Sequence, residues 1–313
     1  VNAGPNSGTA STGSYNTAIG GSALQNNTTA SQNVAVGYQA GYTCTVGGLT
    51  ALGYQAGYYS NANTGYNPTF IGYQAGYSST TGTSTVFVGT LSGYSNTTGS
   101  SNIGIGAQAL YSSTTASNLT AVGYQALYTN TGGNSTAVGY QALKANTTGG
   151  SEAFGYQALG ANTTGASNNA FGLLTLSSNT TGSYNTAFGQ QALISNTTAS
   201  YNTAVGYQAG YSNTTGTINA FGAGALYSNT TGARNAAFGA YTLNSNSTGS
   251  YNSAFGGYDA SLIPPMYYNT TGSYNTAFGN GSLANNTTAS NNTAVGYQAG
   301  YYAAGAGNTI MGV

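Results

Sequence analysis

One glycine recurs along the whole chain at nearly constant spacing and divides it into eighteen short repeats. It follows a large apolar residue each time, and the interval is 16 or 17 residues in all but two cases. A short unit repeated in this way is typical of solenoids, in which each repeat stacks on the next. We number each repeat from this glycine, which is position 0, and name the coil after it. The recurring glycines are Gly20, Gly37, Gly53, Gly72, Gly89, Gly106, Gly123, Gly139, Gly155, Gly172, Gly189, Gly206, Gly222, Gly239, Gly256, Gly279, Gly296 and Gly312.

The composition favours a packed all-β fold over a disordered chain. Gly, Asn, Thr, Ser and Tyr dominate, whereas the helix-favouring Lys, Glu and Arg are almost absent. Disorder would not require an apolar residue at one phase of every repeat. The sequence therefore predicts one domain, residues 1–313, folded as a parallel β-solenoid (a β-roll or β-helix) of about 18 coils that is trimeric or polymeric. Irregular longer coils near residues 58–68 and 257–269 are expected to bulge outward.

Each repeat predicts a strand at positions −4 to −1, a bend at the glycine, a second strand at +1 to +5 and a final turn. Position −1 is apolar in every repeat, and position −2 is Ala in 14 of the 18. Successive strand residues point to opposite faces, so both faces of the first strand are apolar, which is typical of strands covered on both sides. We expect position −1 to form the inner column of the coil and the small Ala column to face another chain.

Position +4 is nearly always either Leu or Gly. Where it is Gly, as at Gly41 and Gly210, the next residue is always Tyr, as at Tyr42 and Tyr211. Loss of a buried Leu side chain without replacement costs about 2–5 kcal/mol. We therefore expect the Tyr ring to fill the gap that the glycine leaves in the core.

Asparagine recurs at position +7, in an Asn-Thr-Thr-Gly turn, and again at position −4. Asn and Gly tolerate the left-handed conformation of a corner, and stacked Asn side chains can form hydrogen-bonded ladders in place of surface charges. The same tripeptide also matches the acceptor for Asn-linked glycosylation, although the turn by itself explains the Asn. The possible glycosylation sites are Asn96, Asn146, Asn162, Asn179, Asn196, Asn213, Asn229 and Asn269.

Position +1 is often Tyr and position +2 often Gln, which predicts two further surface columns. Aromatic rings beside amide groups suit the recognition of glycans, whereas stacked identical side chains also stabilise a sheet without any ligand. We favour the second interpretation, because a binding site on every coil would be unusually unspecific. The candidate surface ladder consists of Tyr38, Tyr54, Tyr124, Tyr140, Tyr156, Tyr207 and Tyr297.

Charge and residue inventory exclude most other functions. Only Lys144, Glu152, Arg234 and Asp259 are charged, and the chain has no His. The two acidic residues are six coils apart, about 29 Å along the axis, whereas paired carboxylates of a glycosidase lie about 5–9.5 Å apart. With no His and the single Cys44, we predict no enzyme activity, no cofactor and no metal site. Zero net charge argues against nucleic acid, and no apolar run reaches the roughly 18 residues needed for membrane insertion.

From Asn202 to Ala209 the chain reads Asn-Thr-Ala-Val-Gly-Tyr-Gln-Ala. It resembles the head repeats of trimeric autotransporter adhesins and is even more similar to the repeat shafts of phage tail-fibre and bacterial surface fibre proteins. The resemblance covers nearly all of the chain and implies a secreted or virion-attached trimer engaged in adhesion, but it assigns no binding residue.

We therefore expect the structural subunit of an extracellular fibre, on a cell surface, in a secreted filament or on a virion. It would give reach, rigidity and multivalent adhesion. Its partners would be copies of itself, as a homotrimer or end-to-end polymer, and a cell-surface glycan or protein receptor. The alternative is a surface that binds ice or glycans through stacked Thr, Asn and Tyr columns, with Thr rows at positions +8 and +9.

Overall fold

A computed structural model describes residues 12–45, 47–61, 67–257 and 263–312. In these residues the chain is an all-β, parallel β-solenoid without helices, which confirms the predicted fold class. Contacts divide the chain into two compact units, Val1–Ala153 and Phe154–Val313. The prediction of a single domain stays a prediction. The extra residues of the two longer coils, together with Asp259, lie outside the described residues.

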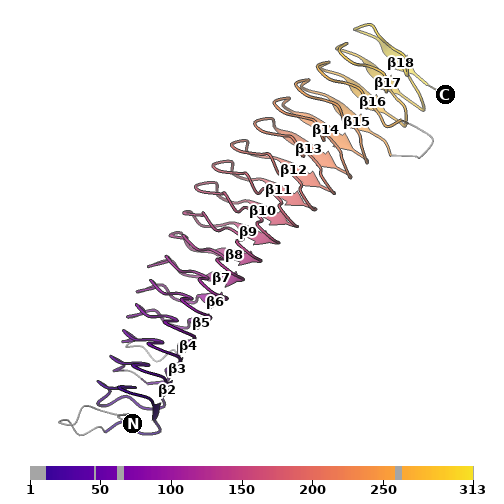
Figure 1. Ribbon diagram of the computed structural model, residues 1–313. Coiled ribbons are helices and arrows are strands. Elements are labelled where there is room, and N and C mark those ends of the chain that lie inside the picture. The colour runs from indigo at the N-terminus through magenta and orange to yellow at the C-terminus, as the bar shows by residue number, and fades with distance from the viewer. Residues whose placement is uncertain (1–11, 46, 62–66, 258–262, 313) are drawn as a thin grey trace. The chain divides into compact units, whose positions relative to one another are not determined.

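Each repeat contributes one strand of three or four residues that ends at position −1, and Figure 1 shows these strands side by side with the turns of each coil behind them. The first unit contains β1 (Thr17–Ile19), β2 (Val34–Val36), β3 (Thr50–Leu52), β4 (Thr69–Ile71), β5 (Val86–Val88), β6 (Ile103–Ile105), β7 (Leu119–Val122) and β8 (Ser135–Val138). Strand β9 (Glu152–Phe154) crosses the boundary. The second unit contains β10 (Asn169–Phe171), β11 (Thr186–Phe188), β12 (Thr203–Val205), β13 (Ile218–Phe221), β14 (Asn235–Phe238), β15 (Ser253–Phe255), β16 (Thr276–Phe278), β17 (Thr293–Val295) and β18 (Thr309–Met311).

Within each unit, every strand pairs in parallel with the strand of the next repeat. Equivalent positions lie opposite one another, as Ala187 of β11 lies opposite Ala204 of β12 and Phe188 opposite Val205. Each position of the repeat therefore becomes a column of like side chains, spaced by the distance of about 4.8 Å between paired strands.

The prediction of a second strand at positions +1 to +5 is wrong, because this segment is a run of turns. In the coil of Gly123, Gln125 at +2 and Leu127 at +4 have φ values of 53° and 49°. Two left-handed residues separated by one other bend the backbone too sharply for a strand. Hydrogen bonds to both neighbouring coils stabilise the bends: the Gln125 amide donates to the Ala107 carbonyl at 3.0 Å and the Leu127 amide to Ala142 at 3.1 Å.

The core lies on the opposite side of the strand from the one predicted. Ala187 at position −2 is fully buried, whereas Phe188 at −1 is 43% exposed, and position −2 is buried and position −1 is not in every strand from β2 to β17. The two walls lie close together between positions −2 and +3: a Cβ atom on Gly104, at position −2, would lie 2.8 Å from the Ser92 hydroxyl at position +3. Small residues at −2 and +3 let the two walls pack closely, so the large residues at −1 face outward.

The gap beside Gly at position +4 is filled by a large core residue and not by the following Tyr. The Phe70 ring, at position −2, lies where side chains of Gly57 and Gly76 would project, and Phe87 plays the same part for Gly93. At Gly210 the filling residue is Ile218. The prediction that Tyr fills the gap is therefore wrong: where position +4 is Gly, a large core residue at position −2 or −4 restores the lost volume.

This exchange of volume predicts that Gly76→Leu destabilises the chain by about 1–3 kcal/mol through overpacking. Its Cβ would lie 2.8 Å from the Phe70 ring carbon Cγ, and backbone conformation is no obstacle, because Leu110 adopts a φ of 54° at the same position of another coil. We expect Gly76→Leu combined with Phe70→Ala to be more stable than either single variant. Urea unfolding midpoints measure this; strictly additive losses would contradict it.

Candidate functional site

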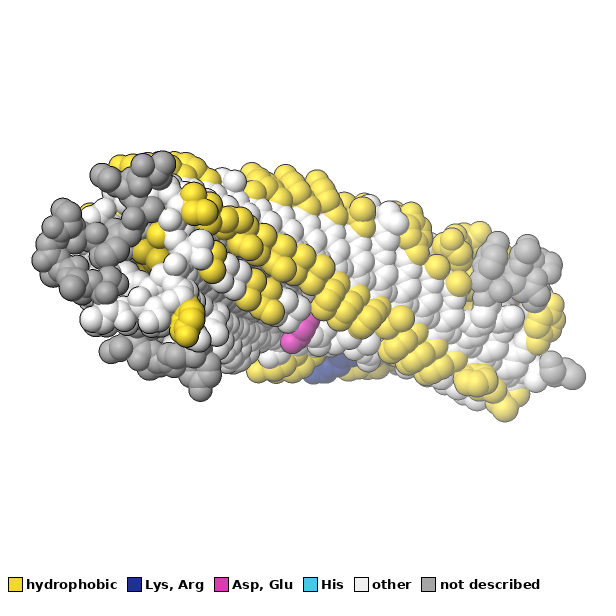
Figure 2. Space-filling model, turned by 90° about the horizontal axis from the view of Figure 1, so that it is seen from below, with side chains coloured by type: hydrophobic (Ala, Val, Ile, Leu, Met, Phe, Trp, Pro, Cys, Tyr) yellow, Lys and Arg dark blue, Asp and Glu magenta, His cyan; other side chains and the backbone are white. Residues whose placement is uncertain are grey.

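The outer face of the strands carries a continuous apolar column at position −1. In the second unit it is rich in Phe: the rings of Phe154, Phe171 and Phe188 are stacked with centroids 4.7 and 4.3 Å apart. A second stack runs from Phe221 to Phe278 through Phe238 and Phe255. In the first unit the column is aliphatic. Figure 2 shows hydrophobic side chains in rows that run from coil to coil, separated by polar rows.

The Tyr side chains of the predicted ladder at position +1 are exposed, and several neighbouring rings stack. Tyr38 stacks on Tyr54 at 5.5 Å, Tyr54 on Tyr73 at 5.2 Å, and Tyr124 on Tyr140 at 5.3 Å. The remaining members Tyr156, Tyr207 and Tyr297 are likewise exposed.

The Gln side chains at position +2 form a parallel ladder. The Gln55 amide donates to Gln39 at 2.7 Å and the Gln125 amide to Gln108 at 2.8 Å. These mutual contacts support the interpretation of both columns as stabilising ladders.

A second Tyr ladder, at position +5, was missed as a surface feature because these rings were assigned to the core. Six half-buried rings stack without interruption, with centroids 4.9–5.3 Å apart: Tyr42, Tyr58, Tyr77, Tyr94, Tyr111 and Tyr128. Tyr111 and Tyr128 follow Leu rather than Gly, and this was the sequence signal that position +5 does not replace the missing Leu.

Crowding in this ladder predicts how stability depends on pH. Burial raises the pKa of the Tyr58 and Tyr77 phenols above the ordinary value of 10.0, and their Tyr neighbours raise it further. The folded chain holds these protons more tightly than the unfolded chain, so this contribution is complete below pH 10 and is lost as the pH rises through the raised folded pKa.

With no His and only two acidic side chains, we expect a constant melting temperature from pH 5 to 9 and a fall above pH 10. Thermal unfolding followed by circular dichroism measures it. The variant with Tyr58→Phe and Tyr77→Phe should fall less in alkali, and a decline between pH 5 and 9 would contradict the prediction.

The Asn ladders exist, but they lie in the core and not on the surface. At position +7 the Asn196 amide donates to Asn179 Oδ1 at 2.8 Å, and the Asn229 amide donates to Asn213 Oδ1 at 2.8 Å. At position −4 the side-chain oxygen accepts instead from the backbone of the next coil, as Asn185 Oδ1 does from the Asn202 amide at 2.9 Å.

This placement contradicts the eight possible glycosylation sites. All eight side chains are fully buried, so the folded chain has no room for a glycan on any of them. The turn and the ladder account for the Asn-Thr-Thr sequence. The sites are Asn96, Asn146, Asn162, Asn179, Asn196, Asn213, Asn229 and Asn269.

The Thr row at position +8 also serves the fold. The hydroxyls of Thr80, Thr180 and Thr230 each donate to a backbone carbonyl of the next coil at 3.0 Å. The row at position +9 is exposed, for example at Thr98 and Thr181, and parts of the +8 row are exposed as well, for example at Thr114 and Thr163. The ice-binding alternative stays a prediction, although hydroxyls of one of its two rows already form hydrogen bonds within the fold.

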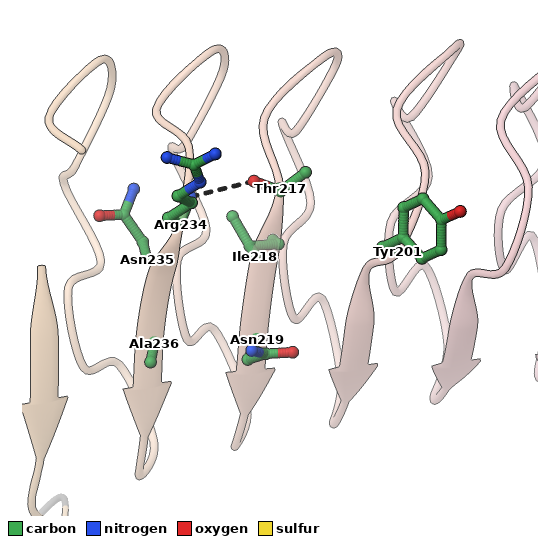
Figure 3. Close-up of a pocket in the computed structure, with 7 residues that line it drawn as sticks. All are labelled: Tyr201, Thr217, Ile218, Asn219, Arg234, Asn235 and Ala236. Atoms are coloured by element: carbon green, nitrogen blue, oxygen red, sulfur yellow. Dashed lines mark hydrogen bonds between the residues drawn. The ribbon is translucent and has the colours of Figure 1, made fainter. Parts of the chain in front are cut away.

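The coil of Gly222 interrupts several surface ladders at once. Its positions +1 and +2 are Ala223 and Gly224 in place of Tyr and Gln, and its position −5 is Thr217, whereas the preceding coil carries Tyr201 and the following coil Arg234. The first change leaves a hollow of about 260 Å³ that is lined by Tyr207, Gln208, Gly224, Tyr227, Tyr241, Asn244 and Tyr267. The second leaves another of about 240 Å³, drawn in Figure 3, that is lined by Tyr201, Thr217, Ile218, Asn219, Arg234, Asn235 and Ala236.

The described residues contain no group of three or more His, Cys, Asp or Glu side chains that could hold a metal ion. Cys44 is buried. Because Asp259 lies outside the described part of the chain, its distance from Glu152 stays a prediction. A search of the same residues finds no helix with the length and apolar character needed to cross a membrane.

No protein-family model matches the chain, and no curated protein is significantly similar to it in sequence.

Proposed function

We propose that this chain is the structural subunit of an extracellular or virion-attached fibre, in which copies pack against one another and provide reach, rigidity and multivalent adhesion. The observation that carries the proposal is the exposed apolar column at position −1. Phe188 is 43% exposed and Phe278 58%. Burial of apolar surface contributes about 25 cal/mol per Å², so a row of such side chains favours a covering partner.

A second copy of the chain suits this column better than an unrelated protein does. The column presents one apolar side chain per coil, about every 4.8 Å. A surface with the same period can contact every side chain of the column, and the position −1 column of another copy has that period. The net charge is zero, so copies do not repel one another electrostatically.

The continuous ladders support rigidity within each unit. The position +7 ladder alone joins successive coils through buried amides from Asn162 to Asn286, with donor–acceptor distances of 2.7–3.3 Å. Bending the stack would break several such hydrogen bonds at each coil, and each contributes about 0.5–1.5 kcal/mol.

The mass of the native particle in solution tests the proposal. Sedimentation equilibrium should give a small multiple of the 31.1 kDa chain mass or a polymer, and electron microscopy should show fibres of matching thickness. A single 31.1 kDa species at every concentration would contradict self-association through this face.

A further inference from the structure

Position −5 forms an outer column of Tyr rings in the second unit, and the hollow at Thr217 lies where this column lacks a ring. On one side of it the Tyr184 and Tyr201 rings stack at 5.1 Å, and on the other the Tyr251 and Tyr274 rings stack at 4.7 Å. Between these pairs lie Arg234 and Thr217, and Thr217 has no ring to offer. Figure 3 shows the open side of β13 and β14 between Tyr201 and Arg234.

Arg234 is the only arginine of the chain and gives the hollow a positive charge. Its guanidinium lies over the Tyr251 ring, 5.1 Å from the centroid, and donates to the Tyr251 hydroxyl. Its backbone amide donates to the Thr217 hydroxyl oxygen at 3.0 Å, the contact dashed in Figure 3. A guanidinium has five N–H donors, so donors remain for an anion, and the described residues that line the hollow include no acidic side chain.

The remaining lining suits a sugar ring. Tyr201 is 70% exposed and presents an aromatic ring, while the Thr217 hydroxyl and the exposed Asn219 amide offer hydrogen bonds to ring hydroxyls. The volume of about 240 Å³ is below the roughly 300–1,000 Å³ of pockets for drug-sized ligands, which favours a single ring. A carboxylate matches the planar fork of arginine, with two parallel hydrogen bonds.

We propose that this hollow binds a hexuronate residue, the acidic sugar of anionic polysaccharides. Its carboxylate pairs with the Arg234 guanidinium, and its ring occupies the place that Thr217 leaves open beside Tyr201. This inference goes beyond the structural role and does not depend on self-association. Each chain carries one such site, so a fibre of many copies would bind a polysaccharide through many weak contacts at once.

The single arginine makes the contact directly measurable. In protein labelled with ¹⁵N-arginine, the only side-chain Nε signal belongs to Arg234, and magic-angle-spinning NMR detects it in a single chain or an assembled fibre alike. Titration with glucuronate should shift this signal saturably, whereas glucose and acetate should bind at least about tenfold more weakly, because each lacks one of the two recognised groups. Equal affinity for acetate would reduce the hollow to a plain anion contact, and equal affinity for glucose would remove Arg234 from recognition. Either result, or no shift with glucuronate, overturns the proposal.

Matched variants locate the site. Thr217→Tyr supplies the missing ring and should weaken glucuronate binding about tenfold or more while Arg234 is retained. Tyr201→Ala removes a ring from the hollow instead of adding one and should also weaken binding. It tests the same site should Thr217→Tyr fail to fold. Tyr124→Ala, in the position +1 ladder of the first unit, should leave the affinity unchanged. Unaltered affinity in both Thr217→Tyr and Tyr201→Ala would overturn the placement of the ring.

Discussion

Asn229→Leu is expected to lower the free energy of unfolding by about 2–6 kcal/mol, because it removes one member of a buried ladder. The Asn229 amide donates to Asn213 Oδ1 at 2.8 Å and to the Gly232 carbonyl at 2.9 Å, and its oxygen accepts from the Asn246 amide at 2.7 Å. Leucine has a similar size but no polar atom. The two acceptors would stay buried without this donor, at about 1–3 kcal/mol each.

Asn219→Leu is the matched control for this variant, since Asn219 lies exposed on the outer face of β13. A surface substitution of this kind should change stability by no more than about 0.5 kcal/mol. Urea unfolding followed by circular dichroism measures both variants. If Asn229→Leu were as stable as Asn219→Leu, the ladder would contribute nothing to the fold.

Replacing two members of the apolar column by charge is expected to dissociate the proposed fibre. With Phe188→Glu and Phe278→Glu, assembly would bury two unpaired carboxylates, a cost of several kcal/mol, so the dissociation constant should rise about a hundredfold or more. Both Phe residues are exposed in the single chain, which should therefore still fold. Sedimentation equilibrium should show a shift to the 31.1 kDa chain.

The control places the same charges on the turns, with Thr181→Glu and Thr271→Glu. Thr181 lies at position +9 and Thr271 at the equivalent place of the longer Gly256 coil, and both are exposed on turns away from the strands. This variant should keep the mass of the native particle. If both variants dissociated alike, added charge alone would explain the effect; if neither did, position −1 would not be the contact between copies.

The ladders could be predicted because they depend on a local rule. A repeated residue in register becomes a column, so the Tyr38 to Tyr54 stack and the Gln39 to Gln55 hydrogen bond follow from spacing alone. The hollow at Thr217 could not be predicted in the same way. Its lining comes from three successive coils. The hollow exists because the coils keep their spacing where Thr217 supplies no ring.

The repeat pattern alone did not show which face of the strand points into the core, although the sequence held one clue. Large residues at position −2, Phe70 and Phe87, occur in coils that have Gly76 and Gly93 at position +4. Such an exchange of size indicates contact between two positions. The repeat pattern assigns the filling of the gap beside Gly to the Tyr that follows it, and not to the large residue at position −2.

The sequence by itself determined an all-β parallel solenoid with one coil per repeat, because a glycine and an apolar residue at fixed phase permit only in-register stacking. Only the tertiary structure decided which of two adjacent apolar columns is the core. Strand alternation makes positions −2 and −1 equally eligible, and the hydrophobic effect by itself would bury the larger. The close approach of the opposite wall, seen where Gly104 meets Ser92, favours small residues at position −2 and leaves the Phe column of position −1 on the outer face, where it is available to a second chain.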